Sequence, residues 1–242
     1  MPLVKACLNG GTTRAEHPAV PLTPDELARD AAACVAAGAG ALHFHVRDPE
    51  GLETLEPEPT AAALQAVRDA CPGVPVGLTS GLWIAGEDPG RRLALIRSWT
   101  VRPDFVSVNL SEAGAPELAG ALLEDGVGIE AGLFEENDAD ALGRATYAEF
   151  LLRVLIEPGD EDGPAAALER AAAIEARLDV AGVAAPRLHH SFGSVTWPVI
   201  DAALARGRDV RIGLEDTTVM PDGRTAAGNA ELVAEAVRRA AA

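Results

Sequence analysis

The chain has 242 residues, of which 48% are hydrophobic and 24% are charged, a composition typical of a globular protein. Its formal net charge of −17 argues against nucleic acid and anionic membrane surfaces as partners. No apolar run approaches the roughly 20 residues that span a bilayer, no secretory signal opens the sequence, and three widely spaced cysteines suggest buried thiols. We therefore expect a cytoplasmic protein.

Short apolar runs alternate with longer helical patterns along the first half of the chain. Thr23 begins the first helical pattern with a capping hydroxyl, followed by Pro24 and two acids, and Gly38 ends it. We predict four units, each a strand and then a helix: Val4–Leu8 and Thr23–Gly38, Ala41–Arg47 and Pro59–Ala70, Val74–Leu78 and Asp88–Ser98, Phe105–Val108 and Ala115–Glu124.

The second half of the chain repeats this alternation. We predict four further units: Val127–Ala131 and Asp138–Tyr147, Phe150–Ile156 and Pro164–Asp179, Arg187–Ser191 and Trp197–Ala205, Val210–Leu214 and Ala227–Ala242. Alternation without a linker indicates a parallel sheet. Eight units in this length favour a closed (β/α)₈ barrel, the TIM barrel, formed by residues 1–242 as a single domain. No GxGxxG follows the first strand, which argues against a dinucleotide-binding sheet.

The most informative local pattern is the pair His43 and His45 on the second predicted strand. Residues two apart in a strand face the same way, so both imidazoles point together. The pair lies at the carboxyl end of its strand, where the active sites of barrels are found. Two histidines in a polar layer of the barrel are the alternative, but neutral imidazole is a good ligand for zinc and related metals. We therefore predict that this pair forms half of a metal site.

Glu215, at the end of the eighth strand, is the predicted third ligand. The second and eighth strands of a closed barrel both flank the first, so they lie roughly 10 Å apart, and inward side chains from both can reach one ion. Three protein ligands leave positions open for water or substrate, which is typical of catalytic metal sites.

Arg211 and Asp216 accompany this ligand on the same stretch of chain. An arginine inside a barrel needs an anionic partner, and a structural Arg–Asp pair is the simpler interpretation. The alternative is a catalytic base, Asp216, which Arg211 holds in position. Its pKa would then be low, so the metal would have to acidify the proton that Asp216 removes.

The sequence resembles the β-keto acid cleavage enzymes, of which the 3-keto-5-aminohexanoate cleavage enzyme is typical. Three segments carry the resemblance and span nearly the whole chain: Thr12–Pro18 with Pro21–Pro24, then His43–Arg47, then Val210–Asp216 with Gly228–Val233. The resemblance implies a zinc-dependent (β/α)₈ barrel, usually a homotetramer. It also implies a transferase that condenses a β-keto acid with acetyl-CoA or another acyl-CoA and cleaves the adduct to acetoacetate and a new CoA thioester.

The same resemblance assigns roles to individual residues. His43, His45 and Glu215 would bind zinc or a similar divalent ion, and Arg211 with Asp216 would remove the α-proton of the keto acid. The expected substrate contacts stand at other strand ends: Thr79 or Ser80, with Gly81, Ser107 and Asn109, and Glu130 on the fifth strand.

Two departures from the family pattern concern carboxylates. The Gly-Ala-Glu that follows the first strand in better-known members is absent after Gly10-Gly11, and Glu16 does not clearly replace it. Gly132 stands where members place a carboxylate on the fifth strand. Because an ammonium group needs such partners, we expect a keto acid with a neutral or anionic tail.

Two other functions fit parts of the pattern. An amidohydrolase-like zinc hydrolase also has HxH in a barrel, but there the pair follows the first strand. A barrel that binds metal or acyl-CoA without turnover is the non-enzymatic alternative, and an assay with keto acids and acetyl-CoA separates it from the enzyme.

Overall fold

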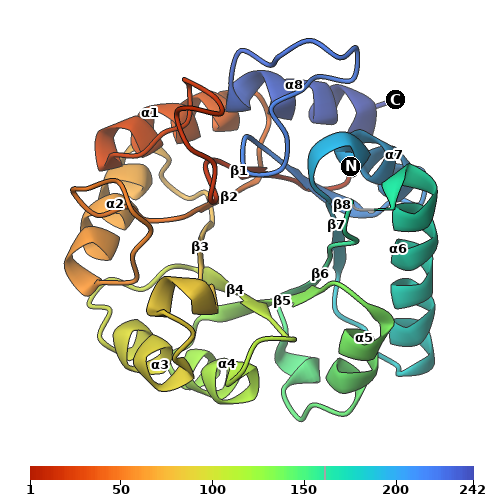
Figure 1. Ribbon diagram of the computed structural model, residues 1–242, viewed down its shortest axis with the longest axis horizontal. Coiled ribbons are helices and arrows are strands. Elements are labelled where there is room, and N and C mark those ends of the chain that lie inside the picture. Colours follow the sequence, from red (N-terminus) through yellow and green to blue (C-terminus); the bar gives the residue numbers. More distant parts are fainter. Residues whose placement is uncertain (161) are drawn as a thin grey trace.

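The computed structural model describes residues 1–160 and 162–242. Its strands form one closed parallel barrel in chain order, and the helices surround it, as Figure 1 shows looking along the barrel. The strands are Val4–Cys7 (β1), Ala41–Phe44 (β2), Val76–Thr79 (β3), Phe105–Asn109 (β4), Gly128–Leu133 (β5), Arg153–Ile156 (β6), Arg187–His189 (β7) and Asp209–Ile212 (β8). The predicted (β/α)₈ barrel is confirmed.

Each strand is followed by a helix that packs on the outside of the barrel (Figure 1). The α-helices are Pro24–Ala36 (α1), Pro57–Ala70 (α2), Pro89–Arg97 (α3), Ala115–Glu124 (α4), Glu136–Gly143 (α5), Gly163–Val180 (α6), Thr196–Leu204 (α7) and Asn229–Ala240 (α8). Three 3₁₀ turns in the described part of the chain connect helices and strands: Leu82–Ala85 (η1), Ala148–Phe150 (η2) and Gly193–Val195 (η3).

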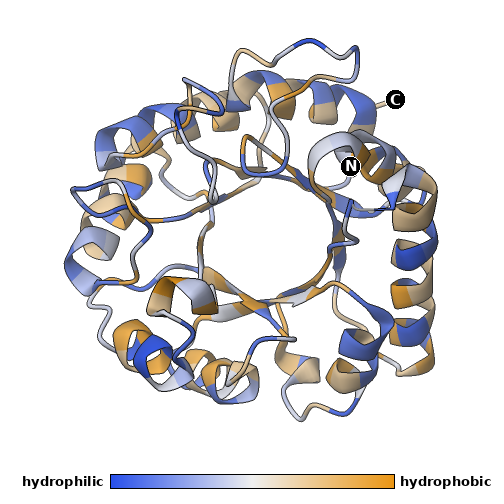
Figure 2. Ribbon diagram, in the orientation of Figure 1, coloured by the Kyte–Doolittle hydropathy of each residue, from blue (hydrophilic) through white to orange (hydrophobic). Residues whose placement is uncertain are grey.

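Local sequence signals explain where the helices begin and which face they bury. The Thr23 hydroxyl caps α1 by accepting a hydrogen bond from the Glu26 N–H. The Glu26 carboxylate in turn accepts a hydrogen bond from the Thr23 N–H, which completes a capping box. The buried residues of α2 are Thr60, Ala63, Leu64 and Val67. This spacing puts them on one stripe that faces the strands, and Figure 2 shows both hydropathy colours on the helices around the ring of strands.

The sixth strand is shorter than the sequence predicts. It begins at Arg153 rather than Phe150, because the Phe150 N–H bonds to the Tyr147 carbonyl and closes η2 instead of joining the sheet. The turn η1, which carries Trp83, was not predicted either. Within residues 1–160 and 162–242, no helix is both long and apolar enough to cross a membrane.

Candidate active site and metal centre

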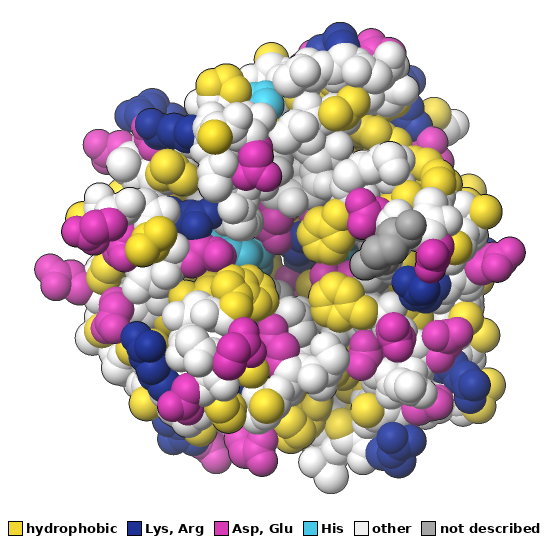
Figure 3. All heavy atoms as spheres, in the orientation of Figure 1, with side chains coloured by type: hydrophobic (Ala, Val, Ile, Leu, Met, Phe, Trp, Pro, Cys, Tyr) yellow, Lys and Arg dark blue, Asp and Glu magenta, His cyan; other side chains and the backbone are white. Residues whose placement is uncertain are grey.

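A cavity of about 240 Å³ lies at the carboxyl ends of the barrel strands. Figure 3 shows a hollow near the centre of this face, with histidine and acidic side chains at its edge. The residues that line the cavity are Gly11, His43, His45, Thr79, Trp83, Ser107, Asn109, Phe134, Glu157, Phe192, Arg211 and Glu215. A larger groove of about 830 Å³ lies beside α4 and α5, but no histidine is among its lining residues. The chemistry therefore centres on the smaller cavity.

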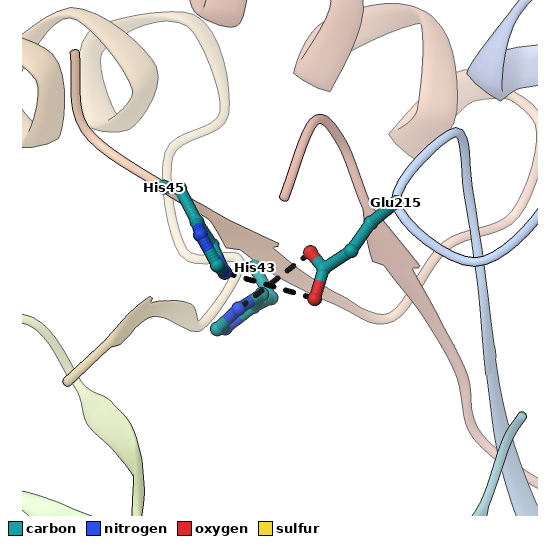
Figure 4. A group of neighbouring side chains, drawn as sticks. All are labelled: His43, His45 and Glu215. Carbon is teal, nitrogen blue, oxygen red and sulfur yellow. Dashed lines mark ion pairs between the residues drawn. The ribbon is translucent and has the colours of Figure 1, made fainter. Parts of the chain in front are cut away.

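His43, His45 and Glu215 come together on one side of this cavity (Figure 4). One ligand atom of each residue lies within 4.8 Å of the others. The Nε2 atoms of His43 and His45 are each 3.7 Å from an oxygen of Glu215. Glu215 Oε2 is buried and has no hydrogen-bond partner in the described part of the chain. Two imidazoles and one carboxylate with this spacing fit a divalent metal such as zinc.

The charge states of these side chains also suit a metal. Burial lowers the pKa of His43 well below its usual value, so its imidazole stays neutral and keeps a free lone pair. Burial has the largest single effect and raises the pKa of Glu215, but the neighbouring basic groups, Arg211 foremost, together lower it by more. The resulting pKa is about 2, so the carboxylate is ionised at neutral pH.

An asparagine amide fixes the chain where it leaves β2. The strand ends at Phe44, one residue before His45. Asn9 Oδ1 accepts a hydrogen bond from the His45 N–H at 2.8 Å, and Asn9 Nδ2 donates to the His45 carbonyl at 2.9 Å. The Asn9 side chain thus makes the backbone hydrogen bonds that a neighbouring strand would otherwise make. It holds His45 beside His43, although β2 has already ended.

Glycine and a second asparagine position Glu215 in a similar way. Asn229 Oδ1 accepts from the Leu214 N–H, and Asn229 Nδ2 donates to the Leu8 carbonyl, both at 2.7 Å. Gly10 has φ +50°, and a Cβ atom there would lie 2.2 Å from Glu215 Cγ. Only glycine permits so close an approach in this conformation.

Glu53 is a partner of His45 that sequence reasoning missed. Its Oε1 accepts a hydrogen bond from His45 Nδ1, which leaves Nε2 free to face the metal position. Its Oε2 accepts from the indole N–H of Trp83 at 3.1 Å. Carboxylates behind a ligating histidine set its tautomer and ring orientation. Glu53 therefore joins the candidate metal site to Trp83, which forms an aromatic wall of the cavity.

Replacing Glu53 with glutamine should weaken metal binding by about 10–100-fold, because His45 then loses its charged partner but remains a ligand. Competition with a chromophoric chelator measures this affinity directly. Glu50→Gln is the matched control, since Glu50 is exposed on the same loop. Equal affinities of the two variants would show that Glu53 does not orient His45.

Arg211 and Asp216 form the predicted pair at the end of β8. Asp216 Oδ1 accepts from Arg211 Nε at 3.0 Å and from Nη2 at 2.7 Å. The same Nη2 donates to Glu215 Oε1 at 2.7 Å, so the arginine links Asp216 to the candidate metal ligand. Burial raises the pKa of Asp216, but Arg211 and His190 outweigh it and the net shift is downward. Asp216 Oδ2 is buried without a hydrogen-bond partner among the described residues, which leaves it available to accept a proton.

The other predicted contacts divide into two groups. Thr79, Ser107 and Asn109 line the cavity. Ser80 lies behind it and donates to the Ser107 carbonyl at 2.6 Å, so Thr79 rather than Ser80 faces the substrate space. Gly81 is also not a lining residue, but a Cβ there would lie 2.2 Å from the Trp83 ring, so the glycine makes room for that wall.

The structure does not bring Glu130 to the cavity. Its carboxylate is fully buried inside the barrel, 2.5 Å from the Lys5 ammonium and 3.3 Å from Arg153 Nε. A substrate contact was predicted for Glu130, but two cations hold its side chain inside the barrel instead. Glu130 therefore balances buried charge in the barrel interior.

Glu16 does not replace the carboxylate missing after the first strand. Its side chain is exposed and accepts hydrogen bonds from the backbone and hydroxyl of Thr13. The neighbouring His17 is buried, and its Nε2 lies 2.9 Å from the Ala226 carbonyl. Both side chains stabilise the loop rather than the cavity.

Glu157, directly after β6, is a charged lining residue that the sequence analysis did not predict. The rule that located Glu215 also applied to it, because both carboxylates follow a barrel strand at its carboxyl end. The strand-end position alone could have identified Glu157. Asn9 and Glu53 gave no such signal, since their roles depend on contacts across the fold.

Comparison with known proteins gives one family. The sequence model described as beta-keto acid cleavage enzyme matches residues 3–148 and 161–242. A 3-keto-5-aminohexanoate cleavage enzyme of Fusobacterium nucleatum is 27% identical over 98% of this chain and 90% of its own length. A 3-oxoadipate:acetyl-CoA acetyltransferase of Cupriavidus necator is 30% identical over 47% of this chain and 39% of its own.

Solved structures resemble the fold. ObcA in a ternary complex with a C4-CoA adduct and oxalate has a TM-score of 0.74 at 18% identity, covering 91% of this chain and 63% of that one. A 3-dehydroquinate dehydratase from Enterococcus faecalis has a TM-score of 0.64 at 13% identity, over 89% of each chain. The chain thus spans a little under two thirds of the ObcA chain. At these identities the likeness extends to the barrel alone.

Proposed function

Because the chain belongs to the β-keto acid cleavage enzyme family, we propose that it condenses a β-keto acid with an acyl-CoA and cleaves the product. With acetyl-CoA as the acyl donor, the products are acetoacetate and the CoA thioester of the remaining keto-acid fragment. The cleavage of a carbon–carbon bond and the transfer of an acyl group make this a Claisen-type transferase.

The observation that carries the proposal is that three candidate metal ligands line the cavity beside Arg211, and that Arg211 also holds the buried carboxylate of Asp216, which is not itself a lining residue. His43, His45 and Glu215 offer a metal site, and Arg211 links Glu215 to Asp216 through two hydrogen bonds. A metal site alone would also suit a hydrolase. A buried carboxylate held beside it by arginine suits removal of a proton from carbon.

We propose that His43, His45 and Glu215 hold zinc. The chemistry that bound zinc supplies here is Lewis-acid polarisation of a carbonyl oxygen, which makes the neighbouring C–H more acidic. Asp216 needs this help, since its pKa is lowered and its carboxylate alone is a weak base.

Asp216 performs the first proton transfer in this proposal. Its Oδ1 stays bound to Arg211, while Oδ2 takes the proton from C2 of the keto acid. The electron pair left on C2 attacks the thioester carbonyl carbon, and the CoA thiolate leaves. Thr79, Ser107 and Asn109 line the space where the keto acid would be held.

The second half of the reaction returns the thiolate to the substrate. The CoA sulfur attacks the original keto carbonyl at C3, and the C2–C3 bond breaks. The electron pair goes back to C2, which takes up the proton from Asp216. One C–C bond and one C–S bond form, and one of each breaks, so no oxidant or reductant is needed.

Incubation of the metal-loaded protein with acetyl-CoA and a panel of β-keto acids tests the function. We expect acetoacetate and a new CoA thioester in equal amounts from at least one keto acid, measured by mass spectrometry. Asp216→Asn serves as the negative control. A protein that holds metal but converts no member of the panel would instead favour a binding barrel without turnover.

A further inference from the structure

Glu157 brings a carboxylate into the cavity from an unexpected strand. It follows β6 directly, and its N–H bonds to the Leu133 carbonyl at 2.9 Å, which extends the pairing with β5. Glu157 is only 4% exposed, yet it lines the cavity. Glu157 has no role in the proposed reaction steps.

Gly132 on β5 provides the space for this carboxylate. A Cβ atom at position 132 would lie 2.6 Å from Glu157 Oε1 and 2.8 Å from Asn109 Oδ1, closer than real Cβ contacts. Any side chain there would displace Glu157 or Asn109. The expectation that Gly132 leaves the cavity short of a carboxylate is therefore corrected, because a neighbouring strand supplies one.

The two oxygens of Glu157 have different surroundings. Oε2 lies 3.0 Å from Nε2 of the buried His190, a close contact without hydrogen-bond geometry. Oε1 is buried and has no hydrogen-bond partner within the described ranges of the chain. Burial raises the pKa of Glu157, but His190, Arg211 and Lys5 outweigh it and the net shift is downward. The group is therefore a charged acceptor with one oxygen free.

None of the described residues around Glu157 donates a hydrogen bond to its Oε1 atom. Trp83, Phe134 and Phe192 contribute aromatic surface to the cavity, and Asn109 turns its amide N–H toward Glu112 at 3.0 Å. A buried acceptor without a partner costs about 1–3 kcal/mol, and a donor on a ligand would recover that cost.

We propose that Glu157 is a specificity-determining residue that selects keto acids whose tail carries a hydrogen-bond donor, an ammonium or a hydroxyl group. The inference rests on the proposed function for the identity of the substrate as a keto acid. A methyl tail leaves Oε1 unpaired, and a carboxylate tail meets a like charge. An ammonium tail would differ from the neutral or anionic tail expected from the sequence, whereas a hydroxyl tail is neutral and would agree with it.

Four keto acids of equal length, with ammonium, hydroxyl, methyl and carboxylate tails, test the proposal. We expect kcat/KM for the preferred donor-bearing tail to exceed that for methyl by at least tenfold, because a site built around a hydrogen bond rejects analogues that lack it. The ammonium and hydroxyl arms identify which donor the protein takes. A methyl or carboxylate tail that performs as well as the better of the two donor tails would overturn the inference.

Glu157→Gln separates the role of charge from that of shape. Because the glutamine amide keeps an acceptor oxygen but loses the charge, we expect the ammonium preference to fall about tenfold or more while the hydroxyl preference changes little. Glu149→Gln, at an exposed acid, should leave every preference unchanged. A wild-type preference for ammonium over methyl that persists unchanged in Glu157→Gln would overturn the inference.

Binding without turnover distinguishes this inference from the proposed function. Calorimetry of each keto acid with metal-loaded protein, without acyl-CoA, reports tail preference even if no reaction occurs. Absence of turnover together with tighter binding of donor tails would contradict the proposed function and support the role of Glu157. Equal binding of all four tails contradicts that role whatever the turnover.

Discussion

His45→Ala should leave the protein with little bound metal. The variant keeps His43 and Glu215 but removes one of three ligands, and the 3.7 Å contact between His45 and Glu215 is lost. Removing a ligand should reduce affinity well beyond the roughly 10–100-fold that changes behind a ligand cost. Elemental analysis after dialysis against a metal buffer measures the stoichiometry, which we expect to be about one zinc per wild-type chain.

His17→Ala is the matched control for this variant. His17 is also a buried histidine, but it lies outside the cavity and contacts the Ala226 carbonyl. It should retain the metal, although the lost hydrogen bond should cost about 1 kcal/mol of stability. Full metal occupancy in His45→Ala would show that the three residues are not the ligands.

Asp216→Asn should keep its metal and lose most of its turnover. The asparagine oxygen can still accept from Arg211, and Glu215 remains paired with the same guanidinium. Loss of a general base typically reduces the rate by about 10²–10⁴-fold. The sensitive measurement is exchange of the C2 protons of a substrate keto acid in deuterated water, after subtraction of the enzyme-free rate.

Asp222→Asn controls for removal of an acid from the same region, since the Asp222 side chain is 64% exposed. It should exchange C2 protons at the wild-type rate. Exchange at that rate in Asp216→Asn, with the metal retained, would mean that another group removes the proton. A loss of metal in Asp216→Asn would instead assign Asp216 to the stability of the metal site.

The buried charges around this site depend on one another. Arg211 is 3% exposed and lies against Glu215 and Asp216, and it also lowers the pKa of Glu157. Removal of one member of such a group leaves the others without compensation, and this is far more costly than the net contribution of the pair. Substitutions that keep shape, such as the asparagine and glutamine variants, are therefore the informative ones.

The barrel and the candidate metal-binding cluster could both be predicted from the sequence. Alternating strand and helix patterns are local, and eight of them in this length leave few architectures other than a closed barrel. The period of two put His43 and His45 on one face. Barrel closure then made the eighth strand a neighbour of the first, which brought Glu215 to the same place without any knowledge of side-chain contacts.

The tertiary structure decided the partners of these residues. Glu130 faces inward as its strand position requires, but Lys5 holds it inside the barrel, and no local pattern reveals a pairing across 125 residues. The contacts of Asn9 and Glu53 with His45 could not be predicted for the same reason. Each contact depends on where two loops meet in the folded chain. Glu157 occupies space that Gly132 leaves on another strand, so the shape and charge of the cavity depend on packing between strands rather than on the sequence pattern within one.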